Sequence, residues 1–207
     1  MRGNGRKDLK TAILDFDKEF NLIYLEDYDN KNYFLDYENG ELKNVINDNP
    51  SKNLIDNGNF TNNLSGWTKL SGTNVSKQNN SERRLRSDSG ALRIKGSENK
   101  DSGVLQKISK TDGFKKGEKY IVEAYLNAPD AVALTNNKKM GVIISTSQNQ
   151  SGVPVSSDII VQTNYQPYIN TWQLQKQIVT IPEDTDNLYI YLYYGYMPGY
   201  CYFDSVK

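Results

Sequence analysis

The stretch Asn53-Leu54-Ile55-Asp56-Asn57-Gly58-Asn59-Phe60, followed by Leu64-Ser65-Gly66-Trp67, decides how the rest of the chain is interpreted. It opens a run of short segments in which apolar and polar residues alternate between clusters of Gly, Asn, Asp and Pro. The run closes at Tyr202-Phe203-Asp204-Ser205-Val206. Alternation with a period of two is typical of half-buried strands, and no convincing stripe has the 3.6-residue period of a helix. The sequence therefore predicts an all-β sandwich of two antiparallel sheets, with the opening and closing segments as neighbouring strands.

The expected strands of the sandwich are residues 54–55, 91–95, 103–109, 119–127, 141–147, 159–163, 172–181, 188–194 and 201–206. Trp67 and Trp172 lie at strands or strand ends with apolar neighbours, so we expect both rings to fill space between the sheets. The single cysteine, Cys201, is flanked by apolar and aromatic residues and is expected to be a small buried side chain.

A turn-rich segment at residues 47–51 marks a domain boundary, because Pro50 forces the residue before it out of the helical region. Residues 1–50 contain four expected strands, 12–16, 21–26, 33–37 and 42–46, with an Asn39-Gly40 hairpin turn. We interpret residues 1–50 as a β-hairpin or meander that forms a connector or the end of a preceding repeat. Residues 51–207 form the sandwich. Residues 37–45 resemble one copy of a YD-type repeat.

Composition excludes several classes of function. The chain has 25 basic and 25 acidic residues and no net charge, which argues against nucleic acid as a partner. It has no histidine, so triads built on an imidazole and histidine-ligated zinc are absent. No apolar run approaches the ~20 residues that span a bilayer, so membrane insertion is not expected.

Residues 53–206 resemble the jelly-roll carbohydrate-binding modules of families 4, 9, 16 and 22. The opening segment resembles their first strand and Gly66-Trp67 the turn that follows it. Residues 91–94, 103–108 and 114–120, Thr171-Trp172, Ile181-Pro182 and the closing segment resemble later parts in the same order. The resemblance implies a jelly roll that binds an oligosaccharide or polysaccharide without catalysis. It further implies a monomeric module of a larger extracellular, cell-surface or cell-wall protein.

Members of these families often hold a structural calcium ion between the first and last strands. Asp204 matches the C-terminal aspartate of the family. The glutamate that usually follows the phenylalanine is replaced by Thr61, which removes a carboxylate ligand. The resemblance therefore implies a weak calcium site made by Asp204 with backbone oxygens of Asn57 and Thr61.

Strand alternation selects the candidate sugar-binding residues. In residues 188–194 the core takes Leu188, Ile190 and Leu192, which leaves Tyr189, Tyr191 and Tyr193 on an exposed face. In residues 120–127 the same logic leaves Glu123, Tyr125 and Asn127 opposite the core; the side on which Gln106 lies is undecided. Tyrosine rings stack on the apolar faces of pyranoses, and Glu, Gln and Asn bind hydroxyls. These residues predict a tyrosine-lined concave face.

Two other functions stay open. Tyrosine is favoured in strands and cross-strand tyrosine pairs stabilise a sheet without binding anything, so the sandwich can be a structural or protein-interaction spacer of a cell-wall or phage-tail protein. Part of a glycoside hydrolase is the second alternative. It requires two carboxyl groups that face each other across a cleft at ~5–10 Å.

Overall fold

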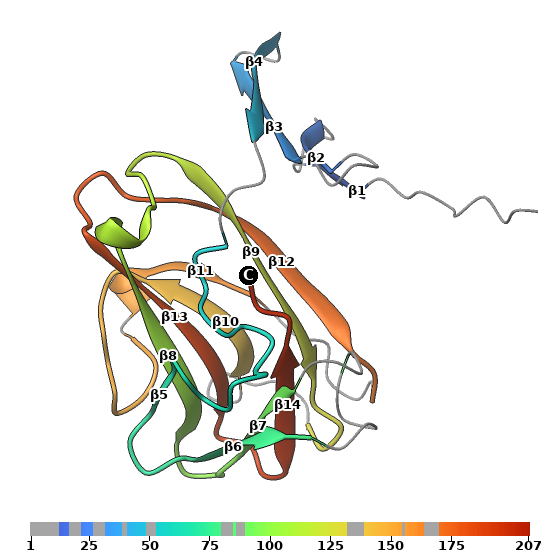
Figure 1. Cartoon of the computed structure of the whole chain (residues 1–207), viewed down its shortest axis with the longest axis vertical. Coiled ribbons are helices and arrows are strands. Elements are labelled where there is room, and N and C mark those ends of the chain that lie inside the picture. The colour runs from blue at the N-terminus through green and yellow to red at the C-terminus, as the bar shows by residue number, and fades with distance from the viewer. Residues whose placement is uncertain are drawn as a thin grey trace, which may run out of the picture. The chain divides into compact units, whose positions relative to one another are not determined.

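The computed structural model describes residues 53–79, 85, 90–131, 139–154, 156–163 and 170–207 and, before them, the backbone of four strands. The chain divides into two compact units, Met1–Lys52 and Asn53–Lys207. The first unit is an antiparallel sheet of β1 (Ile13–Phe16), β2 (Leu22–Glu26), β3 (Asn32–Glu38) and β4 (Glu41–Asp48), in chain order (Figure 1). A meander is therefore present here, whereas the YD-type resemblance stays a prediction.

The second unit is a sandwich of two five-stranded antiparallel sheets, which confirms the predicted all-β fold. Sheet I has the order β11-β10-β13-β8-β5: β11 (Ile159–Gln162), β10 (Lys139–Ser145), β13 (Asn187–Gly195), β8 (Asp101–Ser109), β5 (Thr68–Lys69). Sheet II has the order β12-β9-β14-β7-β6: β12 (Gln173–Thr180), β9 (Lys119–Asn127), β14 (Tyr200–Asp204), β7 (Ala91–Lys95), β6 (Asn74–Gln78). Two 3-10 turns, η2 (Lys110–Asp112) and η3 (Ser156–Asp158), complete the described elements. Among the described residues no helix is long and apolar enough to cross a membrane.

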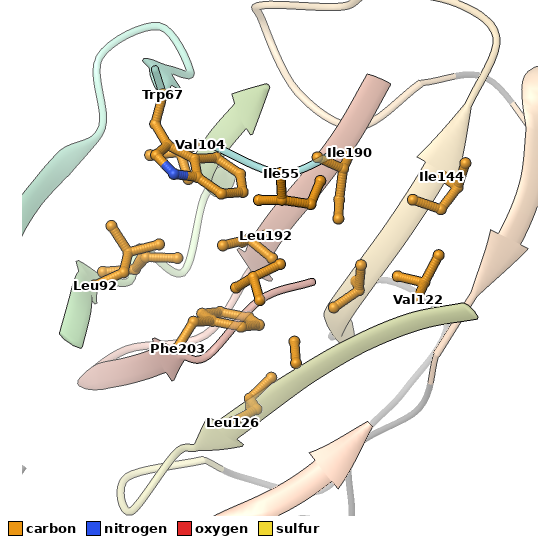
Figure 2. Close-up of a cluster of buried hydrophobic side chains, with 14 of the residues drawn as sticks. Ile55, Trp67, Leu92, Val104, Val122, Leu126, Ile144, Ile190, Leu192 and Phe203 are labelled. Carbon is orange, nitrogen blue, oxygen red and sulfur yellow. The ribbon is translucent and has the colours of Figure 1, made fainter. Parts of the chain in front are cut away.

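Alternate residues of the two sheets meet in a single apolar core (Figure 2). Leu192 and Ile190 of β13 point into it from sheet I, and Leu92 of β7 and Phe203 of β14 enter it from sheet II. Trp67 is 7% exposed and joins this core, as predicted, whereas Trp172 is only half-buried and lies outside it. Cys201 is fully buried in the same core, and burial raises the pKa of its thiol well above the ordinary value.

The opening segment is not the strand that we expected. Residues 53–66 form turns and irregular structure, because Asn57, Phe60 and Asn63 adopt left-handed backbone conformations that no strand can contain. The segment does meet the end of the chain, where the N–H of Val206 donates to the carbonyl of Gly58 at 2.9 Å. A Cβ atom at Gly58 would collide with the Val206 carbonyl oxygen, so only glycine fits this close approach.

The last strand, β14, instead pairs with β7 and β9 in the middle of sheet II. Seven of the other expected strands correspond to strands of the structure, with limits that differ by two residues or less. The short strands β5 and β6 were not predicted. Thr68-Lys69 and Asn74–Gln78 contain one apolar residue, Val75, so neither segment has a visible alternation.

Candidate functional site

The residues expected to contact a sugar lie on two different sheets. Tyr189, Tyr191 and Tyr193 project from β13 to the outer face of sheet I, opposite the core-facing Leu188, Ile190 and Leu192. Glu123, Tyr125 and Asn127 come from β9 and lie on the outer face of sheet II, opposite the core-facing Val122, Ala124 and Leu126. The alternation predicted the right side of each strand. It did not show that these two sides face away from each other.

Two of the three tyrosines on the outer face of sheet I are buried. Tyr191 is 0% exposed and Tyr193 is 1% exposed, in an apolar cluster with Leu70, Leu105 and Ile143. The Tyr191 hydroxyl donates to the carbonyl of Ser147 at 3.0 Å and accepts the N–H of Asn149 at 2.8 Å. The chain that follows β10 therefore lies over the ring. The expected exposure of Tyr191 and Tyr193 is wrong, and only Tyr189 remains partly exposed.

Burial also sets the ionisation of these two phenols. Burial raises the pKa of Tyr193, and the nearby carboxylate of Asp101 raises it further, while a hydrogen bond from the Gln162 side chain acts against both. Burial likewise raises the pKa of Tyr191. Both tyrosines are therefore neutral, hydrogen-bonded parts of the packing of sheet I.

Gln106 faces the inside of the sandwich. Its Oε1 accepts the N–H of Asp56 at 2.8 Å, and its Nε2 donates to the Asp56 carbonyl at 2.9 Å. This pair of bonds imitates a strand partner and fixes the opening segment to β8. Gln106 is 5% exposed, and both ends of its amide are used within the fold. Its side, which the sequence left undecided, is therefore the inner one, and Gln106 does not belong to an exposed sugar-binding face.

The outer face of sheet II combines aromatic, amide and charged side chains in rows across the strands. The strand register pairs Asn127 of β9 with Tyr202 of β14, Tyr202 with Arg93 of β7, and Arg93 with Ser76 of β6. A neighbouring row joins Leu174 of β12, Tyr125 of β9 and Asp204 of β14. Tyr125, Arg93 and Tyr200 are partly exposed, and Leu174 is 39% exposed. This face thus presents aromatic surface next to hydrogen-bonding groups.

A compact ion-pair cluster occupies one part of this face. Glu123 lies 3.2 Å from the ammonium of Lys176 through Oε1 and 2.8 Å from that of Lys207 through Oε2. The side chains of Glu123 and Lys176 are each 9% exposed, whereas that of Lys207 is 59% exposed. Two ammonium groups therefore compensate the one carboxylate.

Asn127 carries an unsatisfied hydrogen-bond acceptor on this face. The residue is 4% exposed, and its Oδ1 is a buried acceptor with no hydrogen-bond donor among the residues that the structure describes. A buried carbonyl oxygen without a donor is costly, and it is normally satisfied by water or a ligand. A hydroxyl group is the natural complement of this oxygen.

Sequence analysis missed Arg93, Tyr200 and Tyr202. The signal was available, because Leu92 and Ile94 mark the core side of β7 and Cys201 and Phe203 that of β14. Arg93 and the two tyrosines occupy the alternate positions. Three tyrosines at alternate positions of β13 give a stronger signal in the sequence, whereas this site is assembled from single residues on separate strands.

The residues expected to bind calcium do not fit a hard cation. The carbonyl of Thr61 accepts the ammonium of Lys77 at 2.7 Å, so a positive charge already lies there. The carboxylate of Asp204 is 0% exposed and accepts the N–H groups of Leu85 at 3.1 Å and Ser205 at 2.6 Å. The backbone oxygen of Asn57 accepts the N–H of Phe60 at 3.1 Å and the indole N–H of Trp67 at 3.3 Å. The Asn57 side chain turns its NH2 group toward nearby carbonyls. No cluster of three or more carboxylate, thiol or imidazole side chains is present in the described part of the chain.

A family model described as "Carbohydrate binding domain", CBM_4_9, matches residues 52–199. The chain belongs to this family of carbohydrate-binding domains. A saccharide is thus the class of ligand, and the predicted resemblance is confirmed. Curated proteins give no match to the chain.

Solved structures with the same fold have low sequence identity. A "Family 16 Carbohydrate Binding Module-2" is 20% identical with a TM-score of 0.53, covering 75% of this chain and 98% of its own. The tailspike protein 4 of bacteriophage CBA120 is 16% identical with a TM-score of 0.51, covering 74% of this chain and 20% of its own. A "Xylan-Binding Domain from CBM 22" is 15% identical with a TM-score of 0.51, covering 72% of this chain and 89% of its own. These likenesses show the sandwich fold.

Proposed function

We propose that the sandwich is a non-catalytic module that binds a glycan on the outer face of sheet II and so tethers a larger extracellular or cell-surface protein. The observation that carries this proposal is that partly exposed Tyr125, Tyr200 and Arg93 lie in the same cross-strand row as Asn127 or in the rows beside it. Among the residues that the structure describes, the Oδ1 of Asn127 has no hydrogen-bond donor. Tyrosine rings offer apolar surface to a pyranose, and the amide and guanidinium bind its hydroxyls.

The carboxylates of this face support binding more than catalysis. Glu123 is ion-paired with Lys176 and Lys207, and Asp204 accepts backbone N–H groups. Hydrolysis of a glycosidic bond requires one carboxyl group that is protonated to act as the acid. Both carboxylates are instead engaged by partners within the fold.

Two tyrosines on opposite faces provide the test. Tyr125 on sheet II and Tyr189 on sheet I are both half-buried, so Tyr125→Ala and Tyr189→Ala remove similar side chains from similar environments. We expect a glycan array and affinity gels to show binding by the unmodified chain. Tyr125→Ala should weaken that binding by roughly tenfold or more, because truncation of an aromatic residue that anchors a ligand costs about 2 kcal/mol or more. Tyr189→Ala should bind as the parent does.

Thermal melting of both variants controls for loss of fold. If Tyr189→Ala bound more weakly than the unmodified chain and Tyr125→Ala bound equally well, the binding site would lie on sheet I instead. If the chain bound no glycan of the array, the spacer role would be favoured, in which the tyrosines only stabilise the sheets.

A further inference from the structure

Charge is unevenly distributed over the outer face of sheet II. On β9 and β12 the carboxylate of Glu123 is compensated by lysines. On β7 the outward residues Arg93 and Lys95 are both cationic. Their cross-strand neighbours on β6, Ser76 and Asn74, are neutral. Neither β6 nor β7 contains an acidic residue, so the half of the face that these two strands form carries positive charge.

Arg93 is held in place by its neighbours. Its Nε donates to the hydroxyl of Ser76 at 3.2 Å, and its guanidinium lies over the ring of Tyr200, 5.4 Å from the ring centre. These contacts use one of the five N–H groups and one face of the plane. No carboxylate among the residues that the structure describes forms an ion pair with it. The terminal amino groups remain available in a fixed orientation.

The nearest described acidic residue along this end of β14 is already engaged. Asp130 uses Oδ2 to accept the backbone N–H of Tyr200 at 3.1 Å. It is exposed to solvent, which screens its charge. Asp130 thus fixes the hairpin that carries Tyr200. Asp204, on the same face of β14, accepts the backbone N–H groups of Leu85 and Ser205, and among the described residues neither carboxylate forms an ion pair with Arg93.

We infer that the glycan is acidic, and that a uronate carboxylate binds the terminal amino groups of Arg93 while sugar rings contact Tyr200 and Tyr125. This inference rests on the proposed function, because it concerns the same face. A planar guanidinium matches the two oxygens of a carboxylate, and stacking on Tyr200 limits the rotational freedom that binding removes. Lys95, exposed and opposite Tyr200, adds charge at the edge.

Polygalacturonate and the same polymer after carboxyl reduction are the matched probes, with dextran sulfate and dextran as a second pair that distinguishes carboxylate from sulfate. We expect the whole chain to bind polygalacturonate roughly tenfold or more tightly than the reduced polymer, which is the scale of one charge-assisted bidentate contact. Rising salt should narrow the difference.

Arg93→Gln should abolish that preference, and Arg93→Lys should retain part of it. Lys69→Gln, which removes an exposed cation from β5 of sheet I, is the control and should retain it in full. Equal binding of both polymers, or a stronger preference for dextran sulfate, would overturn the uronate inference. If the chain still bound neutral glycans in the same gels, the proposed glycan-binding function would stand without the uronate inference. If it bound no glycan at all, both the proposed function and the uronate inference would be overturned.

A different observation, the side chain of Asn57, carries a second inference. Its Nδ2 lies within hydrogen-bond distance of three carbonyl oxygens, which share its two N–H groups: those of Asn62 at 3.2 Å, Asn63 at 3.1 Å and Ser65 at 3.1 Å. Its Oδ1 accepts the N–H of Asn62 at 3.1 Å, and its own carbonyl accepts the indole N–H of Trp67 at 3.3 Å. The Asn57 side-chain amide is thus hydrogen-bonded to several backbone groups of the turn that precedes β5.

We propose that the Asn57 amide and the Lys77 ammonium hold the opening segment by hydrogen bonds, so that its stability does not depend on calcium. Carbonyl oxygens converging on one point are what a calcium ion would otherwise require. Here an NH2 group fills that point, and the Lys77 ammonium binds the Thr61 carbonyl. The substitution of Thr61 for the usual acid is consistent with this arrangement.

Asn57→Asp has almost the same shape but replaces the NH2 donor with a carboxylate oxygen that faces three carbonyls. We expect the melting temperature of Asn57→Asp to fall in EDTA and to recover with millimolar calcium. The melting temperature of Asn57→Ala should lie below that of the unmodified chain and should not recover with calcium. The melting temperature of the unmodified chain should be the same in EDTA and in millimolar calcium. The unmodified chain alone can overturn the proposal. Calcium found in it by elemental analysis, or a melting temperature that EDTA lowers, would contradict a calcium-independent opening segment.

Discussion

On sheet I Tyr191 of β13 lies beneath the chain that follows β10, whereas on sheet II Tyr125 and Tyr200 remain partly exposed beside charged side chains. Both faces carry aromatic residues at alternate strand positions. They differ in what covers them. Period-two spacing reports the side of the strand on which a residue lies, and it contains no information about loops from elsewhere in the chain.

The largest expected difference between the faces concerns Tyr191. Because its ring is fully buried, Tyr191→Ala should lower the free energy of unfolding by about 4 kcal/mol, the usual cost of truncating a buried aromatic. Urea denaturation measures this loss, and glycan binding per folded molecule should not change. Tyr191→Phe, which deletes only the two hydrogen bonds of the hydroxyl, should cost about 1 to 3 kcal/mol. A stable Tyr191→Ala variant with weakened binding would reverse the roles of the two faces.

The next comparison lies within sheet II, between the two lysines that contact Glu123. Lys176→Met should cost about 2 to 3 kcal/mol, because it leaves a carboxylate whose side chain is 9% exposed with one partner fewer. Lys207→Met should cost less than about 1 kcal/mol, because the Lys207 side chain is 59% exposed. Denaturation of the two variants side by side checks the order. Equal losses would show that burial does not determine the strength of these ion pairs.

Alkaline pH should act on sheet I through its buried phenols. Tyrosine has an ordinary pKa of 10.0, and burial raises the pKa of both Tyr191 and Tyr193 in the folded chain. Below about pH 10 the two phenols are protonated in both the folded and the unfolded chain, and their full contribution to the free energy of unfolding is present. Above it the unfolded chain loses protons first, so stability falls by up to about 1.4 kcal/mol per pH unit for each tyrosine. Denaturation at pH 9 and pH 11 measures the slope, which Tyr193→Phe should reduce. An unchanged slope in that variant would contradict the assignment.

Sequence reasoning predicted most of the sheets because β-strand alternation is a local property. Leu188, Ile190 and Leu192 define the core side of β13 without reference to any other strand. It failed for the opening segment, where left-handed residues and the Asn57 hydrogen bonds make a turn from an apolar-polar pattern that resembles a strand. Local alternation cannot reveal such side-chain contacts.

The candidate site was only partly predictable for a related reason. Tyr125 and Asn127 followed from alternation in β9, but Arg93 is a lone cation between Leu92 and Ile94. Its role in the proposed site depends on its cross-strand neighbours, Ser76 on the preceding strand β6 and Tyr202 on β14, which is distant in the sequence. The burial of Tyr191 under residues 147–149 depends on the same kind of distant contact.

The smallest expected effect on stability is at Leu174, which lies opposite Tyr125 and is 39% exposed. Leu174→Asn should change the free energy of unfolding by no more than about 0.5 kcal/mol, because surface substitutions disturb little packing. It should nevertheless weaken glycan binding by roughly threefold, since it removes apolar surface beside the Tyr125 ring. Isothermal titration with a glycan retained on the affinity gels measures this, with Thr68→Asn on the exposed β5 strand of sheet I as the control. Weaker binding by Thr68→Asn alone would place the ligand on sheet I, where the tyrosines are already covered.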